Sequence, residues 1–133
     1  MDNLTKEQRK LNMSRIRSTG TKLELKFFKL LEDNDIHFFK YPKLFGKPDC
    51  QIGGNILVFV DSDFWHGWFF NRWKDRLPKD YWAAKIEGNI LRDRRKFQRL
   101  RKEGYLILRI WGHDIKNDTA LNKVRRFLKK HGL

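Results

Sequence analysis

Hydrophobic residues recur every three or four positions in several segments, which predicts helices with one buried face. The clearest segment runs from Thr21 to Asp33, and its apolar face consists of Leu23, Phe27, Leu30 and Leu31. Thr21 or Thr19 can serve as its N-cap, and Glu24 lies at the margin of the apolar face. Three further helices are expected at about Lys6–Arg17, Tyr81–Lys102 and Asp118–Lys130, the last with Asp118 as its N-cap.

Shorter apolar runs predict the strands, at Ile36–Phe39, Pro48–Ile52, Ile56–Asp61 and Tyr105–Trp111. The run Leu57–Val60 is apolar at every position, so this strand should be central and covered on both faces. The last strand follows a long helix, so it should lie parallel to a neighbour in the same sheet. The sequence therefore predicts an α/β fold in which helices flank a mixed sheet.

The loop of a predicted β-hairpin, at Gly53, Gly54 and Asn55, decides which side chains share a face of the sheet. A two-residue loop would place Val60 on the face that carries Asp49. A three-residue loop would shift the pairing by one residue and place Asp61 there instead. The sequence leaves both registers open.

Composition and charge narrow the function. The 133 residues include 30 Lys and Arg against 16 Asp and Glu, a formal net charge of +14, which usually indicates a polyanionic partner such as nucleic acid; a surface tuned for solubility is the alternative. A hydrophobic content of 40% excludes wholesale disorder, and the single cysteine, Cys50, excludes an internal disulfide and a four-cysteine zinc site. No apolar run approaches ~18 residues and no secretory signal is visible, so we expect a cytoplasmic, nucleoid-associated protein without a membrane partner.

Acidic residues gather at one end of the predicted hairpin. Asp49 lies near the start of one strand, Asp61 ends the other, and Asp63 follows. Crowded carboxylates repel one another unless a cation lies among them, and oxygen ligands of this kind suit Mg²⁺. His66 is the only histidine next to the cluster, and a neutral imidazole is the usual general base near neutral pH. The alternative is a turn aspartate at Asp49 and a packed or solvated loop histidine at His66.

The long helix carries a polar stripe beside its apolar one. The stripe consists of Trp82, Lys85, Asn89, Asp93 and Lys96. Lys and Asn can hydrogen-bond base edges or phosphates, and Trp can stack on bases or wedge between them, although an ordinary solvated face is the alternative. Basic residues of this helix would neutralise phosphates and make binding salt-dependent, namely Arg92, Arg94, Arg95 and Lys96.

An ordered series of short motifs resembles the very short patch repair (Vsr) endonucleases, a branch of the PD-(D/E)xK restriction-endonuclease-like fold. The resemblance extends over roughly Asn12 to Ile115. Each motif is weak alone, whereas the series within one small chain is specific. It comprises Asn12-Met13 with Arg15-Ile16-Arg17, Glu24, Gly46-Lys47-Pro48-Asp49, Phe64-Trp65-His66, Tyr81-Trp82 with Lys85, Asn89 and Asp93, and Leu108-Arg109-Ile110-Trp111.

The resemblance implies an Mg²⁺-dependent endonuclease that nicks one DNA strand beside a T:G mismatch. It implies that Asp49 is a metal ligand, that the backbone carbonyl of Val60 is a second ligand, and that His66 is the general base. Glu24 would be an accessory acid near the scissile phosphate. We also expect Asp61 in the catalytic group, as a further metal ligand.

The resemblance also implies how the DNA is held. Phe64, Trp65 and Trp82 match aromatic residues that the family wedges beside the mismatch, and Met13 matches a residue that inserts from the other groove. Lys85 and Asn89 match positions that contact the mismatched pair, and Arg15 and Arg17 belong to a basic arm at residues 1–20 that we expect to contact DNA. A mismatch costs less to open than a matched pair, which gives a physical route to selectivity.

Two features of the sequence depart from the family pattern. The best-known members hold a structural zinc with cysteines and a histidine, where this chain has Asp63, Trp68, Phe70 and His113. Trp68 and Phe70 cannot bind zinc, so we predict no structural zinc. Asp61 stands where some members have a second active-site histidine, and a carboxylate cannot donate a proton to the leaving group as an imidazolium does.

We therefore expect one Vsr-like domain over residues 1–133, acting as a monomer on mismatched double-stranded DNA. One alternative is a related nuclease of a restriction, phage-defence or mobile-element system with another substrate structure. An alternative of another class is a non-catalytic nucleic-acid-binding module whose acids pair with its arginines.

Overall fold

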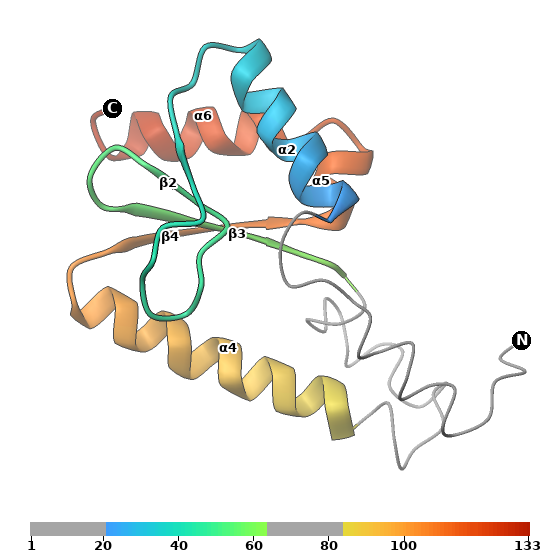
Figure 1. Ribbon diagram of the computed structural model, residues 1–133, viewed down its shortest axis with the longest axis vertical. Coiled ribbons are helices and arrows are strands. Elements are labelled where there is room, and N and C mark those ends of the chain that lie inside the picture. The colour runs from blue at the N-terminus through green and yellow to red at the C-terminus, as the bar shows by residue number, and fades with distance from the viewer. Residues whose placement is uncertain (1–20, 64–83) are drawn as a thin grey trace, which may run out of the picture.

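The computed structural model describes residues 21–63 and 84–133, which form a sheet with helices on both faces (Figure 1). The helices are α2 (Lys22–Asp33), α4 (Ala84–Lys102), α5 (Gly112–Lys116) and α6 (Ala120–Lys130). The strands are β1 (Phe39–Lys40), β2 (Cys50–Ile52), β3 (Ile56–Asp61) and β4 (Leu106–Trp111).

The four strands form one sheet in the order β1-β2-β3-β4. Strand β2 pairs antiparallel with β1 and β3, whereas β3 pairs parallel with β4. Figure 1 shows α4 on one face of the sheet and α2, α5 and α6 on the other. The predicted α/β fold with a mixed, helix-flanked sheet is confirmed, and so is the parallel final strand.

Strand β3 is buried at every position, as its continuous apolar run predicts. Alternate side chains Ile56, Val58 and Val60 join the core cluster on the side of α2 and α6. Leu57 and Phe59 join the other cluster, with Phe97 and Leu100 of α4. Burying a large apolar side chain stabilises the fold by roughly 1.5–3 kcal/mol, so β3 holds both helical layers to the sheet and its end is a firmly fixed position.

Some boundaries differ from the predictions. The first strand is Phe39–Lys40 rather than Ile36–Phe39, because the Ile36 backbone instead closes the end of α2 and its side chain packs on the core. Helix α6 has Thr119 as its N-cap and not Asp118, which has a left-handed φ of +57°. Helix α5 was not predicted, because five residues are too few to show a helical period.

Two predictions on helices fall wholly or partly outside the described residues: the basic helix at Lys6–Arg17 and the first three residues of the helix at Tyr81–Lys102. Within the part of the chain that the structure describes, no helix is long and apolar enough to cross a membrane.

Candidate active site

The hairpin between β2 and β3 has a three-residue loop, because Ile52 faces Ile56 across the ladder. If this register continued without interruption, Asp49 would lie opposite Phe59 and share its face with Asp61. An uninterrupted ladder would thus place Asp49 and Asp61 side by side, as the sequence analysis expects for a three-residue loop.

The pairing shifts by one residue at Asp49, immediately before β2. The Asp49 N–H donates to the Val58 carbonyl oxygen at 2.9 Å, although Cys50 is the residue that faces Val58. Two residues therefore oppose one, as in a β-bulge, and bulges re-aim side chains in this way. The Asp49 carboxylate reaches the edge of β3, where Oδ2 accepts the Val60 N–H at 2.6 Å. The hairpin loop has three residues, yet the bulge places Asp49 beside Val60, which is the arrangement expected for a two-residue loop.

Glu24 lies in the first turn of α2 and is 3% exposed. It forms a capping box with Thr21, in which Glu24 Oε2 accepts the Thr21 N–H at 2.9 Å and Thr21 Oγ1 accepts the Glu24 N–H at 3.3 Å. The Tyr41 hydroxyl donates to the same Oε2 at 2.9 Å. The sequence placed Glu24 at the margin of the apolar face, whereas these bonds hold it in the interior.

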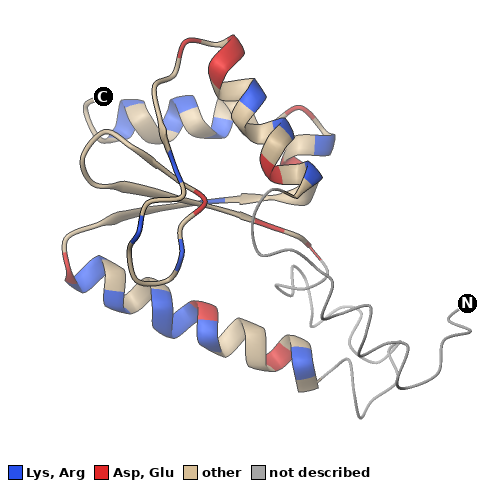
Figure 2. Cartoon of the chain, in the orientation of Figure 1, with Lys and Arg blue, Asp and Glu red and all other residues tan. Residues whose placement is uncertain are grey.

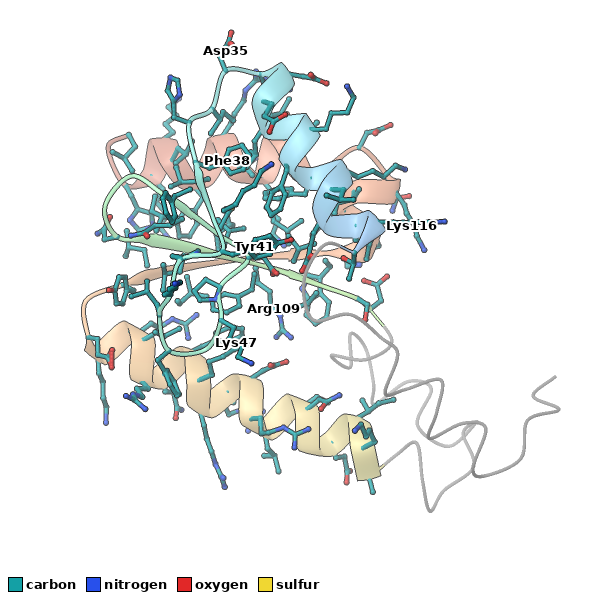
Figure 3. The ribbon with its side chains drawn as sticks, in the orientation of Figure 1. Asp35, Phe38, Tyr41, Lys47, Arg109 and Lys116 are labelled. Atoms are coloured by element: carbon teal, nitrogen blue, oxygen red, sulfur yellow. The ribbon has the colours of Figure 1, made fainter. Side chains whose placement is uncertain are left out.

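Tyr41 contacts both acids, and sequence reasoning missed it. Its hydroxyl binds Glu24, and its backbone N–H donates to the Asp49 carbonyl oxygen at 2.9 Å. Its φ of +49° lies in the left-handed region, and its ring packs edge-on against Phe28, with 5.6 Å between the centroids. Figure 3 shows Tyr41 close to the sheet, below α2. Sequence patterns could not reveal this role, because a single aromatic residue in a loop belongs to no periodic motif.

The carboxyl groups of Glu24 and Asp49 form a buried pair. Burial of Asp49, its hydrogen bond with the Glu24 side chain, and the charges of Glu24 and Asp61 raise the pKa of Asp49 from 3.8 to about 9, although the Val60 N–H lowers it. The donors described around the pair, the Val60 and Thr21 N–H groups and the Tyr41 hydroxyl, are neutral. A cation at this position would therefore compensate the negative charge of the two acids and relieve their mutual repulsion.

The donor chemistry of the pair fits a hard divalent cation such as Mg²⁺, which prefers oxygen ligands. Among residues 21–63 and 84–133, no group of three or more His, Cys, Asp and Glu side chains is arranged to hold a metal ion. Mg²⁺ usually keeps several waters and takes only one or two protein carboxylates, so two acids are enough.

Asp61 lies on the other face of the sheet and has different partners. Arg109 Nε donates to Asp61 Oδ2 at 2.6 Å, and Arg109 Nη2 donates to Asp93 Oδ2 on α4 at 2.7 Å. Lys96 Nζ lies 3.5 Å from the other oxygen of Asp93. Figure 3 shows Arg109 between the sheet and α4. The structure thus brings Glu24 and Asp49 together and places Asp61 in an ion-pair network with α4.

The polar stripe of α4 divides in the structure. Lys85 is exposed and Asn89 is half-buried, where it accepts a hydrogen bond from Arg92. Asp93 is 6% exposed and Lys96 Nζ lies 4.4 Å above the Phe59 ring, so these two side chains turn toward the sheet. Figure 2 shows basic positions along the length of α4. Arg92, Arg94 and Arg95 of this helix are exposed.

Comparison with known proteins decides the family. The sequence profile described as DNA mismatch endonuclease Vsr matches residues 1–72. The chain belongs to the Vsr family of DNA mismatch endonucleases. It is 41% identical over 140 aligned residues to the type II nicking enzyme V.NmeDIP of Neisseria meningitidis serogroup C, covering 100% of this chain and 95% of that protein.

Two further comparisons agree with membership of the Vsr family. The DNA mismatch endonuclease Vsr of Escherichia coli strain K12 is 29% identical over 126 residues, which cover 89% of this chain and 81% of that protein. The homing endonuclease I-Bth0305I catalytic domain superposes with a TM-score of 0.60 at 20% identity, covering 84% of this chain and 98% of that chain. This Vsr-family chain is a DNA endonuclease with a restriction-endonuclease-like fold, and nucleases of this fold generally use divalent metals.

The remaining candidates of this Vsr-family site are placed only in part. Asp63 is bound to His113, with 2.9 Å between Asp63 Oδ1 and His113 Nδ1. The absence of a structural zinc stays a prediction, since Trp68 and Phe70 lie outside the described residues. Cys50 is fully buried, and burial raises the pKa of its thiol, so it fills space beside Asp49. The roles predicted for residues outside the described ranges also stay predictions: Met13, Arg15, Arg17, Phe64, Trp65, His66 and Trp82.

Proposed function

We propose that this endonuclease is Mg²⁺-dependent and nicks one DNA strand beside a T:G mismatch, as a step of very short patch repair. The observation that carries the proposal is the buried Glu24–Asp49 pair, which the bulge at Asp49 aims at the end of a central strand. Membership of a family described as mismatch endonucleases supports the mismatch as the substrate.

Asp49 and the backbone carbonyl of Val60 would hold the metal, with Glu24 as the accessory acid beside them. Bound Mg²⁺ would supply a Lewis acid that stabilises the charge developing on the scissile phosphate. Glu24 keeps its orientation through Thr21 and Tyr41. His66 would take the proton from the attacking water.

Binding of the duplex would use the basic surface of α4, where Arg92, Arg94 and Arg95 are exposed. Lys85 and Asn89 at the start of this helix would contact the mismatched pair. The aromatic wedge of Phe64, Trp65 and Trp82, with Met13 and the arm at residues 1–20, would unstack the duplex at the weak step. The protein would act as a monomer with one domain over residues 1–133.

A second candidate is a strand-nicking enzyme of a restriction system that acts on another DNA structure. The curated relatives favour it, because several are named type II nicking enzymes, V.NmeDIP and V.HpaIIP among them. Both candidates use the same catalytic residues and differ in the substrate alone.

The test is a nicking assay on end-labelled duplexes that carry T:G, each other mismatch, or only matched pairs. We expect nicking with Mg²⁺, none with EDTA, and none with Asp49→Asn, which retains the shape of the side chain. Asp33→Asn, an exposed acid of α2, is the matched control and should nick like the wild type. Activity that survives EDTA or Asp49→Asn would refute the metal site, whereas equal cleavage of matched and T:G duplexes would refute the mismatch.

A further inference from the structure

The charges around Asp61 and Asp93 are balanced within the protein. Both side chains are buried, at 5% and 6% exposure, and each accepts a short hydrogen bond from the same guanidinium, that of Arg109. Lys96 supplies a second positive charge, 3.5 Å from Asp93. Two acids and two bases therefore form a compensated network, in contrast to the Glu24–Asp49 pair with its neutral donors.

Arg109 is itself fixed from several sides. It stands on β4, its guanidinium carbon lies 4.1 Å from the Trp111 ring and 5.1 Å from the Phe97 ring, and its planar fork reaches one acid on β3 and another on α4. A guanidinium can donate in two directions at once with little loss of freedom, which a lysine cannot do. Arg109 therefore joins three elements: β3, β4 and α4.

The position of this network matters because Asp61 directly follows Val60. Alternate residues of a strand point to opposite faces, so the Val60 side chain packs toward α2 while the Asp61 side chain points toward α4. Whatever fixes Asp61 also fixes the last peptide units of β3, including the Val60 carbonyl and the N–H that holds Asp49.

We propose that Asp61 is a positioning residue rather than a metal ligand: Arg109 ties it to Asp93 and thereby fixes the end of β3 to helix α4. The inference rests on the proposed metal site at Asp49. It assigns to Arg109, Asp61 and Asp93 the task of holding the metal-binding strand end in register with the helix that binds DNA.

The test compares Asp61→Asn and Asp93→Asn, which preserve side-chain shape, with Asp49→Asn and the wild type. Mn²⁺ binding is measured by titration calorimetry without DNA, duplex affinity by fluorescence anisotropy in Ca²⁺, and kcat by steady-state nicking in Mg²⁺. Glu103→Gln, which breaks an exposed ion pair with Arg99 on the same helix, is the matched control.

We expect Asp61→Asn and Asp93→Asn to bind duplex like the wild type, to weaken Mn²⁺ binding far less than Asp49→Asn does, and to lose kcat by roughly 10- to 100-fold, the loss typical of a small misplacement at an active site. The double variant should lose little more than either single one, because the two acids act as a unit. Arg109→Lys should also lose kcat, since an ammonium retains the charge and not the fork.

Loss of Mn²⁺ binding in Asp61→Asn to the extent seen in Asp49→Asn would overturn the inference and make Asp61 a ligand. Unchanged kcat, or a kcat loss that vanishes when the temperature is lowered far below the unfolding midpoint, would also overturn it. Mn²⁺ binding that Asp49→Asn leaves intact would instead overturn the metal site itself, and the inference with it, so the two failures are distinguishable.

Discussion

Replacing Asp49 by Asn should stabilise the metal-free protein while it abolishes catalysis. The reason is the burial of Asp49, together with its contact with Glu24, which raises the pKa of Asp49 from 3.8 to about 9. An asparagine can keep the bond from the Val60 N–H through its carbonyl oxygen and can donate its amide N–H to Glu24. It removes the ionisable group and keeps the shape.

The sign and size of the effect follow from proton linkage. The folded protein binds a proton at Asp49 more tightly than the unfolded chain does, so Asp49 makes the wild type less stable as pH rises from about 4 to about 9. One pKa unit corresponds to about 1.4 kcal/mol, so the free energy of unfolding of Asp49→Asn should exceed that of the wild type by about 1–4 kcal/mol at pH 7. The difference should shrink to less than about 1 kcal/mol near pH 4, close to the pKa of the unfolded chain, and should vanish at lower pH, where the group is protonated in both states.

Urea unfolding in EDTA at pH 4, 6 and 8 measures this difference directly. When the urea unfolding is repeated in Mg²⁺, metal binding should raise the free energy of unfolding of the wild type but not that of Asp49→Asn. The increase is about 2.7 kcal/mol when the Mg²⁺ concentration is one hundred times the dissociation constant. A variant less stable than the wild type at pH 8 in EDTA would refute the electrostatic reasoning. Equal stabilisation of both proteins by Mg²⁺ would refute Asp49 as a ligand, and Asp33→Asn again serves as the control.

Three further predictions concern Tyr41, Gly46 and Asp114. Tyr41→Phe removes the hydroxyl that binds Glu24 and keeps the ring, so it should cost about 1 kcal/mol in urea unfolding and slow single-turnover nicking; an unchanged rate would separate Tyr41 from catalysis. Gly46→Ala should destabilise the fold by about 1–2 kcal/mol, because φ is +83° and a Cβ would lie 2.8 Å from the Lys96 side chain; a thermal midpoint equal to the wild type's would contradict this. Burial alone would raise the pKa of Asp114, but hydrogen bonds from the Trp111 N–H and from Lys123 outweigh it and lower the pKa. Asp114→Asn should therefore lose stability at pH 7, and the loss should disappear in acid, below the pKa of Asp114 in the folded protein. A loss of stability that is independent of pH would contradict this.

Periodicity alone was sufficient for much of the fold. The buried face of α2, the hairpin and the fully buried β3 follow from the spacing of apolar residues, and Thr21 as a candidate N-cap follows from a local rule. Each of these features depends on residues close together in the sequence. The start of β1 and the existence of α5 depend on tertiary contacts, so the pattern could not give them.

The sequence named Glu24, Asp49 and Asp61 as candidate site residues and could not predict how they are arranged. Loop length alone would have put Asp49 on the face of Asp61, and a one-residue shift of pairing reversed this. The shift is a backbone event at a single residue, without a sequence period to reveal it. The partners of the two acids were likewise hidden, since Tyr41 and Arg109 lie 17 and 48 positions away from the acids that they bind.

The two faces of β3 explain how a strongly basic protein could keep the proposed cation site. Strand alternation sends Asp61 to the face where Arg109 and Lys96 neutralise it and its neighbour Asp93. The bulge sends Asp49 to the other edge, toward Glu24 and neutral N–H and O–H donors. A lysine or arginine beside Asp49 would neutralise the charge that attracts a metal. Placing Glu24 and Asp49 on one face of the sheet, and Asp61 and Asp93 with their basic partners on the other, therefore preserves the proposed site. The net charge of +14 can then serve DNA binding without cancelling the acids that the proposed hydrolysis requires.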